Sequence, residues 1–117
     1  MDINKMINTV KVNNNYSGMG MIASHLGVVR GKSLNGREVT GIEVKFDRDR
    51  IRGIICNIKK IPGIYEILIE ISEGKLKVGD DIMAVVVGGD IRDHVFPALI
   101  TAVNRIKKEA VTKKEFF

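Results

Sequence analysis

The sequence predicts an α+β fold, a two-layer sandwich in which two main helices pack on a mostly antiparallel sheet. Three observations predict it. Strand-like segments surround two segments of helical periodicity, apolar residues make up 44% of the chain against 28% charged residues, and 117 residues suit one core. We therefore expect residues 1–117 to form a single domain that ends in a basic tail at 108–117.

The first part of the chain is predicted to be extended. Apolar residues within 7–12 suggest a short strand, and the asparagines at 13–15 end it. The segment 21–30 is typical of a buried strand in which Gly27 marks a bulge or a close backbone approach. The pair at 35–36, Asn-Gly, then predicts a turn between two extended runs.

A helix is predicted over residues 48–60. Asp47 precedes it and suits the N-cap position, and Pro62 with Gly63 ends it. Isoleucines at helical spacing form its apolar face. They are Ile51, Ile54, Ile55 and Ile58. Cys56, the only cysteine, lies among them, so we expect it to be buried; a single cysteine excludes an intrachain disulfide and a multi-cysteine metal site.

Two more strands are predicted after this helix. Alternating apolar residues over 65–71 predict a strand with one exposed face. Residues 74–81 form a polar connector, and the uninterrupted apolar run at 82–89 is typical of a fully buried strand. The order of elements is therefore strands, helix, two strands and a second helix.

The last helix carries the pattern that points to function. Asp90 suits its N-cap position, and Pro97 falls within it, where a proline removes a backbone hydrogen bond and favours a kink. Apolar residues at steps of three and four predict one face covering a core. They are Ile91, Val95, Phe96, Leu99, Ile100, Val103 and Ile106. Continued by one turn in each direction, this row reaches Arg92 and Lys107, so both of its ends are positively charged.

Two interpretations of these charged ends stay open. Both side chains can run along apolar surface and keep their charges in water. Alternatively, a lysine at the edge of an apolar pocket loses part of its hydration and can act as a base or a nucleophile. Lys107 fits that placement better than Lys108 or Lys113, and Lys114, beyond the expected helix end, must fold back to approach it.

The charge distribution indicates where an anionic partner would bind. Lysine and arginine total 19 against 14 acidic residues, giving +5, and five cations with two acids between residues 105 and 117 supply +3 of it. A solvated basic tail is the alternative explanation. Nucleic acid is disfavoured as the partner, because only two tyrosines and four phenylalanines are available for base stacking and no known nucleic-acid module is recognisable.

Several classes of protein are excluded by what the sequence contains. The start lacks the layout of a signal peptide, and the run at 82–89 is too short to cross a bilayer, so we expect a cytoplasmic protein without a membrane segment. His25 and His94 lie far apart and have no cysteine or carboxylate at ligand spacing, so no metal site is expected. No serine, histidine and acid set for nucleophilic catalysis stands out.

Three blocks of the sequence, between about Met19 and Glu115, resemble the large (catalytic) subunit of molybdopterin synthase. GVVRGKSLNGREVTGIEV (27–44) is similar to a strand, basic turn and strand of that family. GKLKVGDDIMAVVVGG (74–89) is similar to its connector and buried strand, and IRDHVFPALITAVNRIKKEAVTKKE (91–115) to its last helix and lysine motif. The order and spacing of the blocks make the resemblance fairly specific.

The resemblance implies a defined reaction. Such subunits insert two sulfur atoms into cyclic pyranopterin monophosphate to form the dithiolene of molybdopterin, within molybdenum cofactor biosynthesis. The sulfur comes from the thiocarboxylated Gly-Gly tail of a small ubiquitin-like sulfur-carrier subunit. The large subunits form a homodimer with a small subunit at each end, a heterotetramer, and the resemblance implies no permanently bound cofactor.

The resemblance also assigns roles to residues. Arg30 and Arg92 match substrate-binding arginines, and Lys107 and Lys114 match the two catalytic lysines. Because Arg92 and Lys107 are fifteen residues apart, about 22 Å along a helix, they cannot serve one small substrate from the same chain. Arg92 would therefore reach the pocket of its dimer mate.

This sequence departs from the family pattern at two places. Ile91 replaces a histidine before Arg92, and the family's PxWK is replaced by 111–114, Val-Thr-Lys-Lys. The principal alternative is therefore a diverged, non-catalytic homologue that acts as a dimeric binding or regulatory module. A small basic nucleic-acid-binding domain is the remaining alternative.

Overall fold

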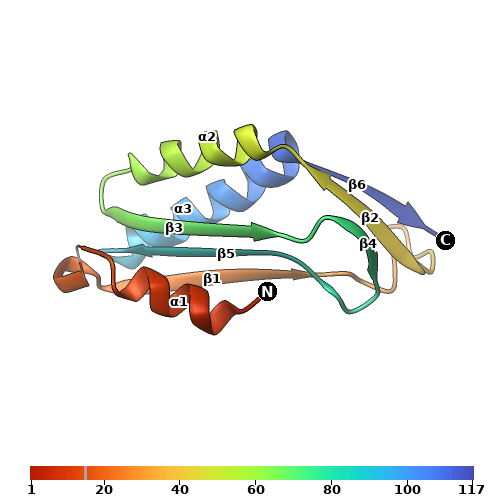
Figure 1. The fold of residues 1–117 in the computed structure, drawn as a ribbon, viewed down its shortest axis with the longest axis horizontal. Helices are drawn as coiled ribbons and strands as arrows, with labels where there is room; N and C mark the ends of the chain where they lie inside the picture. Colours follow the sequence, from red (N-terminus) through yellow and green to blue (C-terminus); the bar gives the residue numbers. More distant parts are fainter. Residues whose placement is uncertain (15) are drawn as a thin grey trace.

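The computed structural model describes residues 1–14 and 16–117, so the part of the expected turn at 13–15 that concerns Asn15 lies outside the described residues. The molecule is elongated, 48 × 25 × 22 Å, and contains two antiparallel sheets of three strands each (Figure 1). The strands are β1 (Met21–Val28), β2 (Gly41–Phe46), β3 (Ile64–Ile71), β4 (Gly74–Lys77), β5 (Asp81–Gly89) and β6 (Val111–Phe116). The helices are α1 (Ile3–Lys11), α2 (Arg48–Lys59) and α3 (Arg92–Arg105), with a 3-10 turn at Tyr16–Gly18 and a π-helical turn, η2, at Ile106–Ala110. The predicted α+β class is confirmed, although the one expected sheet is two.

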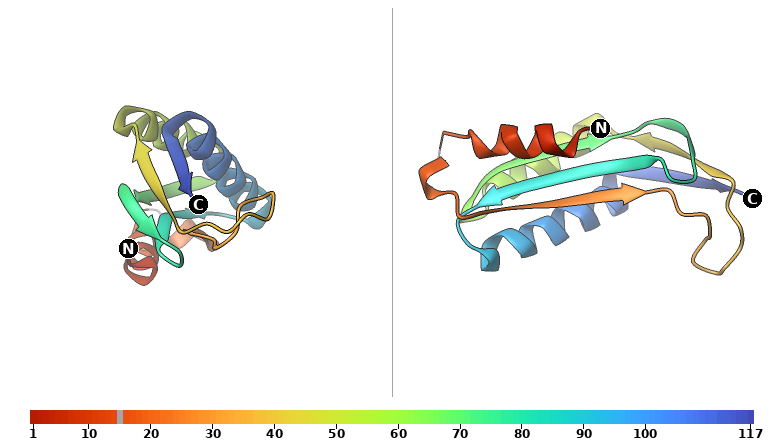
Figure 2. Two further views of the ribbon diagram at one scale, coloured as in Figure 1. Left: turned by 90° about the vertical axis from the view of Figure 1, so that its right-hand side faces the viewer. Right: turned by 90° about the horizontal axis from the view of Figure 1, so that it is seen from below.

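The long sheet has the order β1-β5-β3 and is covered on both faces. Helices α2 and α3 pack on one face and α1 packs on the other, as Figure 2 shows. Alternate side chains of β5 serve the two faces: Val85 and Val87 join the α2 and α3 core, whereas Ala84 and Val86 join the α1 core. This explains the uninterrupted apolar run and confirms the fully buried strand.

Helix α1 replaces the strand expected at 7–12, so that prediction was wrong. Asp2 caps the helix by accepting a hydrogen bond from the Lys5 amide at 3.0 Å, and Met6 and Val10 are buried against the long sheet. Met6 and Val10 are four residues apart, which is helical spacing. Because α1 lies over β3, the exposed face expected for 65–71 is also wrong: Leu68 packs into the α1 core, and Glu70 alone on that strand is exposed.

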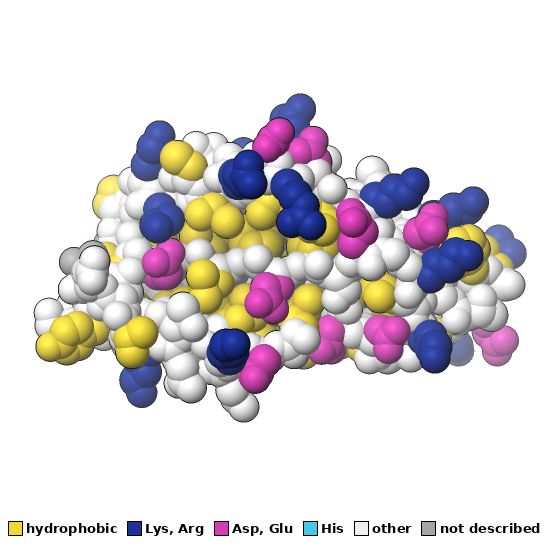
Figure 3. Space-filling model, viewed as in Figure 1, with side chains coloured by type: hydrophobic (Ala, Val, Ile, Leu, Met, Phe, Trp, Pro, Cys, Tyr) yellow, Lys and Arg dark blue, Asp and Glu magenta, His cyan; other side chains and the backbone are white. Residues whose placement is uncertain are grey.

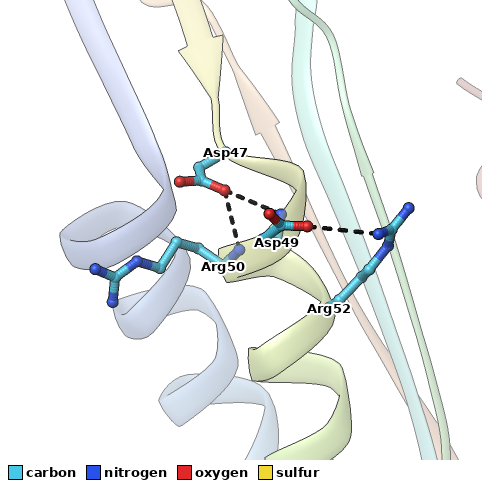
Figure 4. A network of polar contacts seen from close by, with 4 residues as sticks. All are labelled: Asp47, Asp49, Arg50 and Arg52. Atoms are coloured by element: carbon cyan, nitrogen blue, oxygen red, sulfur yellow. Dashed lines mark hydrogen bonds and ion pairs between the residues drawn. The ribbon is translucent and has the colours of Figure 1, made fainter.

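Helix α2 forms as predicted. Asp47 accepts hydrogen bonds from the backbone amides of Asp49 and Arg50 at 2.9 and 3.2 Å, and Asp49 pairs with Arg52 on the outer face (Figure 4). Ile51, Ile54 and Ile58 are buried and Ile55 is partly buried. Cys56 is exposed, contrary to expectation, because it lies on the side of the helix away from those isoleucines.

Helix α3 buries only part of the predicted row. Val95, Ala98 and Ala102 face the sheet, and Ile106 continues the row into η2, whereas Ile91, Phe96 and Ile100 are 50–60% exposed. The helix has two apolar sides, and the small alanines allow the close approach to the sheet, so the bulky residues stay outside. Pro97 lies inside the helix and removes one backbone hydrogen bond, as predicted.

The N-cap of α3 is Ile91, so the capping role expected of Asp90 is wrong by one position. Asp90 instead accepts hydrogen bonds from the Ile91 amide at 2.7 Å and from Nδ1 of His94 at 2.8 Å. The hydrogen bond from His94 is the main reason that the pKa of the Asp90 carboxyl lies below its ordinary value, and the bond from the Ile91 amide lowers it further. Gly63, with φ of +86°, packs so closely against both side chains that a Cβ would overlap them.

The short sheet has the order β4-β2-β6 and lies at the C-terminal end of the molecule. Its outer strands correct two expectations. The polar connector at 74–81 contains β4, and the basic tail at 108–117 is β6 together with the end of η2, paired along the whole of β2. Lys113 and Lys114, expected in a solvated tail, belong to this edge strand and are both exposed.

The remaining surface is of mixed character. Figure 3 shows apolar side chains between α2 and α1, over β3, with charged side chains of both signs around them. Within the described residues, no helix has the length and apolar character needed to cross a membrane. The turn expected at Asn35 and Gly36 is present, with the Gly36 amide donating to the Ser33 carbonyl at 3.0 Å, but the flanking runs pair only through the single bridge of Lys32 with Glu38.

Candidate functional site

A cavity of about 810 Å³ lies where the two sheets meet. Its walls come from β1 and the loop after it, the start of β5, the turn η2 and strand β6. Segments far apart in the sequence therefore surround one space. Among the lining residues are three cations, Arg30, Lys107 and Lys113, and one acid, Glu115, so the cavity suits an anionic ligand.

The turn η2 positions Lys107. Ile106 is fully buried and anchors the turn, and the backbone amide of Asp47 donates to the Ala110 carbonyl at 2.9 Å, which joins the turn to the start of α2. One extra residue per turn in a π-helix changes the direction in which side chains leave the helix. The predicted row along α3 therefore does not continue to Lys107 as a regular helix; η2 directs this lysine into the cavity.

Glu109, two residues after Lys107, already forms an ion pair with Arg105. Arg105 donates two hydrogen bonds to the carboxylate of Glu109, at 2.7 and 3.1 Å, across the same turn. The hydrogen bonds are the principal reason that the pKa of Glu109 lies below its ordinary value and that of Arg105 above it. In the part of the chain that the structure describes, no ion pair involves Lys107, so its charge is available to a ligand.

The loop after β1 positions Arg30. Val29, next to it, is buried, and its backbone is held at both ends: its amide donates to the Asp80 carbonyl and its carbonyl accepts from the Gly79 amide, both at 2.9 Å. These bonds fix the loop against the β4–β5 connection. The structure thus brings together two of the residues predicted from the sequence, Arg30 and Lys107.

Strand β6 places Lys113, and not Lys114, at the cavity. Lys113 lies opposite Val44 and Glu115 opposite Ile42, two buried positions of β2, so both side chains project toward the cavity side. Lys114 lies opposite Glu43 on the other face of the sheet, with its ammonium 5.6 Å from the ring of Phe116. Lys114 was assigned by the family resemblance alone, and the alternation of side chains along a strand places its neighbour Lys113 on the cavity side.

Arg92 lies at the exposed start of α3, the opposite end of that helix from η2. The 14-residue helix is about 21 Å long, so the distance expected between Arg92 and Lys107 within one chain holds. The glycine-rich turn before α3 gives no free anion site, because the carboxylate of Asp90 already accepts the Ile91 amide there. Arg92 does not belong to this chain's cavity.

His25 is a cavity residue that sequence reasoning missed. It lies on β1 between Ala23 and Gly27, on the side of that strand that faces α3 and η2. Its Nε2 atom is buried and has no hydrogen-bond partner among the described residues. Burial first, and then the charge of Lys107, lowers the pKa of His25 below 6.5. The alternation of β1 was the available signal, since His25 and Gly27 share a face.

Metal chemistry finds no support in the described residues. They contain no group of three or more histidine, cysteine, aspartate or glutamate side chains arranged to hold a metal ion.

A cationic cavity built on an α+β scaffold, with lysines in its wall, defines a class of protein that binds an anionic group and can stabilise negative charge developing on it. The family model described as MoaE protein matches residues 1–109, and the chain belongs to this family. It therefore has the role of a molybdopterin synthase large subunit, a transferase of molybdenum cofactor biosynthesis, as the sequence blocks indicated.

Solved structures have the same fold. A molybdopterin synthase from Staphylococcus aureus is 21% identical, with a TM-score of 0.84, and the match covers 100% of this chain and 85% of that one. Molybdopterin cofactor biosynthesis protein E from Burkholderia multivorans is 23% identical, with a TM-score of 0.80, covering 100% and 77%. A complex of subunits 1 and 2 of the molybdopterin-converting factor from Helicobacter pylori is 16% identical, with a TM-score of 0.73, covering 98% and 78%. No curated protein matches the sequence.

Proposed function

We propose that this chain is an active large subunit that transfers sulfur from the thiocarboxylated tail of a small ubiquitin-like subunit to cyclic pyranopterin monophosphate. The observation that carries the proposal is the convergence of Arg30 and Lys107 in one cavity, from segments 77 residues apart. Both the thiocarboxylate tail and the substrate phosphate are anions, and three cations line the cavity. The solved two-subunit complex from Helicobacter pylori supports a small-subunit partner for this fold.

Each cation has a distinct role in this proposal. Arg30 binds the phosphate or the pterin oxygens with charge-assisted hydrogen bonds. Lys107 lies beside the acyl carbon of the tail and stabilises the negative charge that develops on its oxygen. Lys113 takes the assisting role that the resemblance gave to Lys114, because Lys113 is the one that lines the cavity.

The exposed apolar side of α3 supports a homodimer. Phe96 and Ile100 are 51% and 60% exposed on consecutive turns of the helix, and Val103 continues the row. If two copies of α3 pack antiparallel along this row, Arg92 of each chain comes to the end of the other helix that carries Lys107. This dimer supplies the second substrate-binding arginine, which one chain cannot provide.

The dimer is tested by the double substitution Phe96→Glu with Ile100→Glu. Four carboxylates brought together across an antiparallel contact repel one another, so the expected mass in analytical ultracentrifugation is that of a monomer, and sulfur transfer is lost with the partner's arginine. The matched control is Asn57→Glu, at an exposed site on α2 outside this row. A double variant that stays dimeric contradicts this arrangement.

A second candidate function is favoured by Ile91, which stands where the family has a histidine. In that case the chain binds the small subunit without catalysing transfer. Single-turnover conversion of the pyranopterin precursor, with a thiocarboxylated small subunit, separates the two. Formation of molybdopterin establishes the enzyme; tight binding of the small subunit without product establishes the non-catalytic homologue.

A further inference from the structure

His25 is a cavity group to which neither the sequence nor the proposed mechanism gives a task. Its ring lies in the wall of the cavity that holds Lys107, and its buried Nε2 has no hydrogen-bond partner among the described residues. A buried polar atom left without a partner costs free energy, on the order of 1–3 kcal/mol. Such an atom is retained where it has a partner during function.

Gly27 lies directly beside the Nε2 atom of His25. A Cβ placed on Gly27 would lie 3.5 Å from Nε2 and 3.7 Å from the side chain of Met83. Any side chain at position 27 would therefore contact the ring nitrogen from the side of the cavity. Gly27 also lies at the shift of register between β1 and β5, where the strand bends toward the loop of Arg30.

The surroundings of His25 keep its imidazole neutral near pH 7. Lys107 from η2, Arg30 from the loop after β1 and Lys113 from β6 are the cations of the same cavity, and Glu115 from β6 is the acid. On β5 the residue opposite His25 is Val85, which is buried and apolar. Burial, followed by the charge of Lys107, lowers the pKa of His25, and a neutral imidazole accepts protons.

Sulfur transfer contains a step that needs such an acceptor. Once the thiocarboxylate sulfur has bonded to a substrate carbon, the tail is held as a thioester. Water must add to the acyl carbon, and the carbon–sulfur bond of the tail must break, so that the sulfur stays on the substrate as a thiolate. The tail leaves as a carboxylic acid, which ionises to the carboxylate by releasing its proton to solvent. The water gives up a proton as it attacks, and Lys107, as a cation, is suited to the oxyanion and not to that proton.

We propose that His25 is the general base of this hydrolytic step: its neutral imidazole takes the proton of the attacking water, while the Lys107 ammonium stabilises the oxyanion of the acyl carbon. One proton of the water passes to Nε2, and the other leaves with the tail as its carboxylic acid and is released to solvent when the acid ionises, while the sulfur remains bonded to the substrate carbon as a thiolate. This assignment rests on the proposed function, and it gives the chain a proton acceptor although Ile91 stands at the family's histidine position.

The test is single-turnover sulfur transfer by the whole chain with its thiocarboxylated small subunit, from pH 5 to 8. For the His25→Gln variant we expect a rate about 10²-fold lower at pH 7.5. We also expect accumulation of a covalent adduct of the small subunit and the substrate, seen by intact mass spectrometry, because sulfur attack continues while its hydrolysis slows. The rate of the unsubstituted chain falls as the pH drops through the lowered pKa of His25, and the variant lacks this fall.

Two further variants keep the test decisive. Gly27→Ala leaves the histidine in place and puts a methyl group against Nε2, so a reduction of about 10-fold with the same adduct is expected. His94→Gln removes the other histidine, which is paired with Asp90 at the far end of α3, and should retain the fall at low pH. Binding of the small subunit, measured by calorimetry, shows that each variant is folded.

Distinct results overturn the two proposals. If His25→Gln forms product within twofold of the unsubstituted rate, without adduct and with the same pH profile, His25 is not the base and the proposed function stands. If the unsubstituted chain forms no product, the proposed function fails and the assignment of His25 fails with it.

Discussion

The two sheets of this molecule have opposite designs. The long sheet is covered on both faces, and its central strand β5 contributes fully buried residues from Met83 to Gly89. The short sheet covers a small core on one face only, and its edge strand β6 carries Lys113 and Glu115 to the cavity. Burial of apolar area makes the first sheet the main source of stability, while incomplete burial leaves the second free to carry charged groups. The four predictions below test this division.

The largest effect is expected at Lys107. Replacing it with alanine removes the cation that stabilises the oxyanion, and we expect single-turnover sulfur transfer to fall by about 10³-fold. Thermal unfolding should be unchanged, because the side chain forms no ion pair within the described residues. The matched control is Lys108→Ala on the same turn, which should retain activity. Full activity in Lys107→Ala would refute the proposed role.

Substitution of two fully buried valines, one in each sheet, tests whether stability and activity can be changed separately. Val86 packs against α1 in the long sheet, and Val44 lies opposite Lys113 in the short sheet. We expect Val→Ala to lower the free energy of unfolding by about 2 kcal/mol at either position, from lost transfer energy and a residual cavity. Denaturant unfolding measures this loss.

The rate of sulfur transfer is then compared between the two valine variants, at a temperature where both stay folded. Val86→Ala should keep the rate of sulfur transfer, whereas Val44→Ala should lower it, because the strand that positions Lys113 loses its packing. Equal rates in the two variants would show that the sheets are not divided in this way.

Alanine substitutions of the neighbouring lysines Lys113 and Lys114 test the register of β6. We expect Lys113→Ala to slow sulfur transfer about 10-fold, equivalent to about 1.4 kcal/mol, and Lys114→Ala to have little effect, because only Lys113 lines the cavity. Single-turnover rates of the two variants, with substrate at saturation, supply the measurement. The reverse result would mean that β6 shifts by one residue when the small subunit binds.

The smallest effect is a pH dependence at the start of α3. The hydrogen bond from His94 lowers the pKa of Asp90 in the folded state, so its contribution to stability is present above the ordinary value of 3.8 and is lost as the pH falls below it. Urea unfolding between pH 3 and 6 should show a steeper loss for the unsubstituted chain than for His94→Gln. Parallel curves would show that the pair adds nothing to stability.

Local patterns predicted the elements whose signal lies within the element itself. The cap at Asp47, the isoleucine face of α2, the turn at Asn35 and the buried run of β5 are all present. The expected row of α3 was wrong at Ile91, Phe96 and Ile100, because the helix has two apolar sides. Hydrophobicity alone favours such larger residues over Ala98 and Ala102, which are the ones buried. The alanines matter because small side chains let a helix lie close to a sheet.

Strands that need a distant partner were the ones missed. Both β4 and β6 read as polar segments, and each becomes a strand only by pairing with β2, up to 75 residues away in sequence. Strand pairing satisfies backbone groups whatever the side chains are, so composition gives little signal. The side of β6 that faces the cavity depends on the register of that pairing, which is why Lys113 and Lys114 could not be distinguished.

The sequence by itself determined the α+β class, the family blocks and the two cations Arg30 and Lys107. The tertiary structure decided that η2 directs Lys107 into the cavity, that β6 presents Lys113, and that His25 is the fourth basic group there. The physical reason is the range of the interactions. Caps, turns and apolar periodicity act within a few residues, whereas a site formed by β1, η2 and β6 exists only after long-range pairing has fixed which side of each strand faces inward.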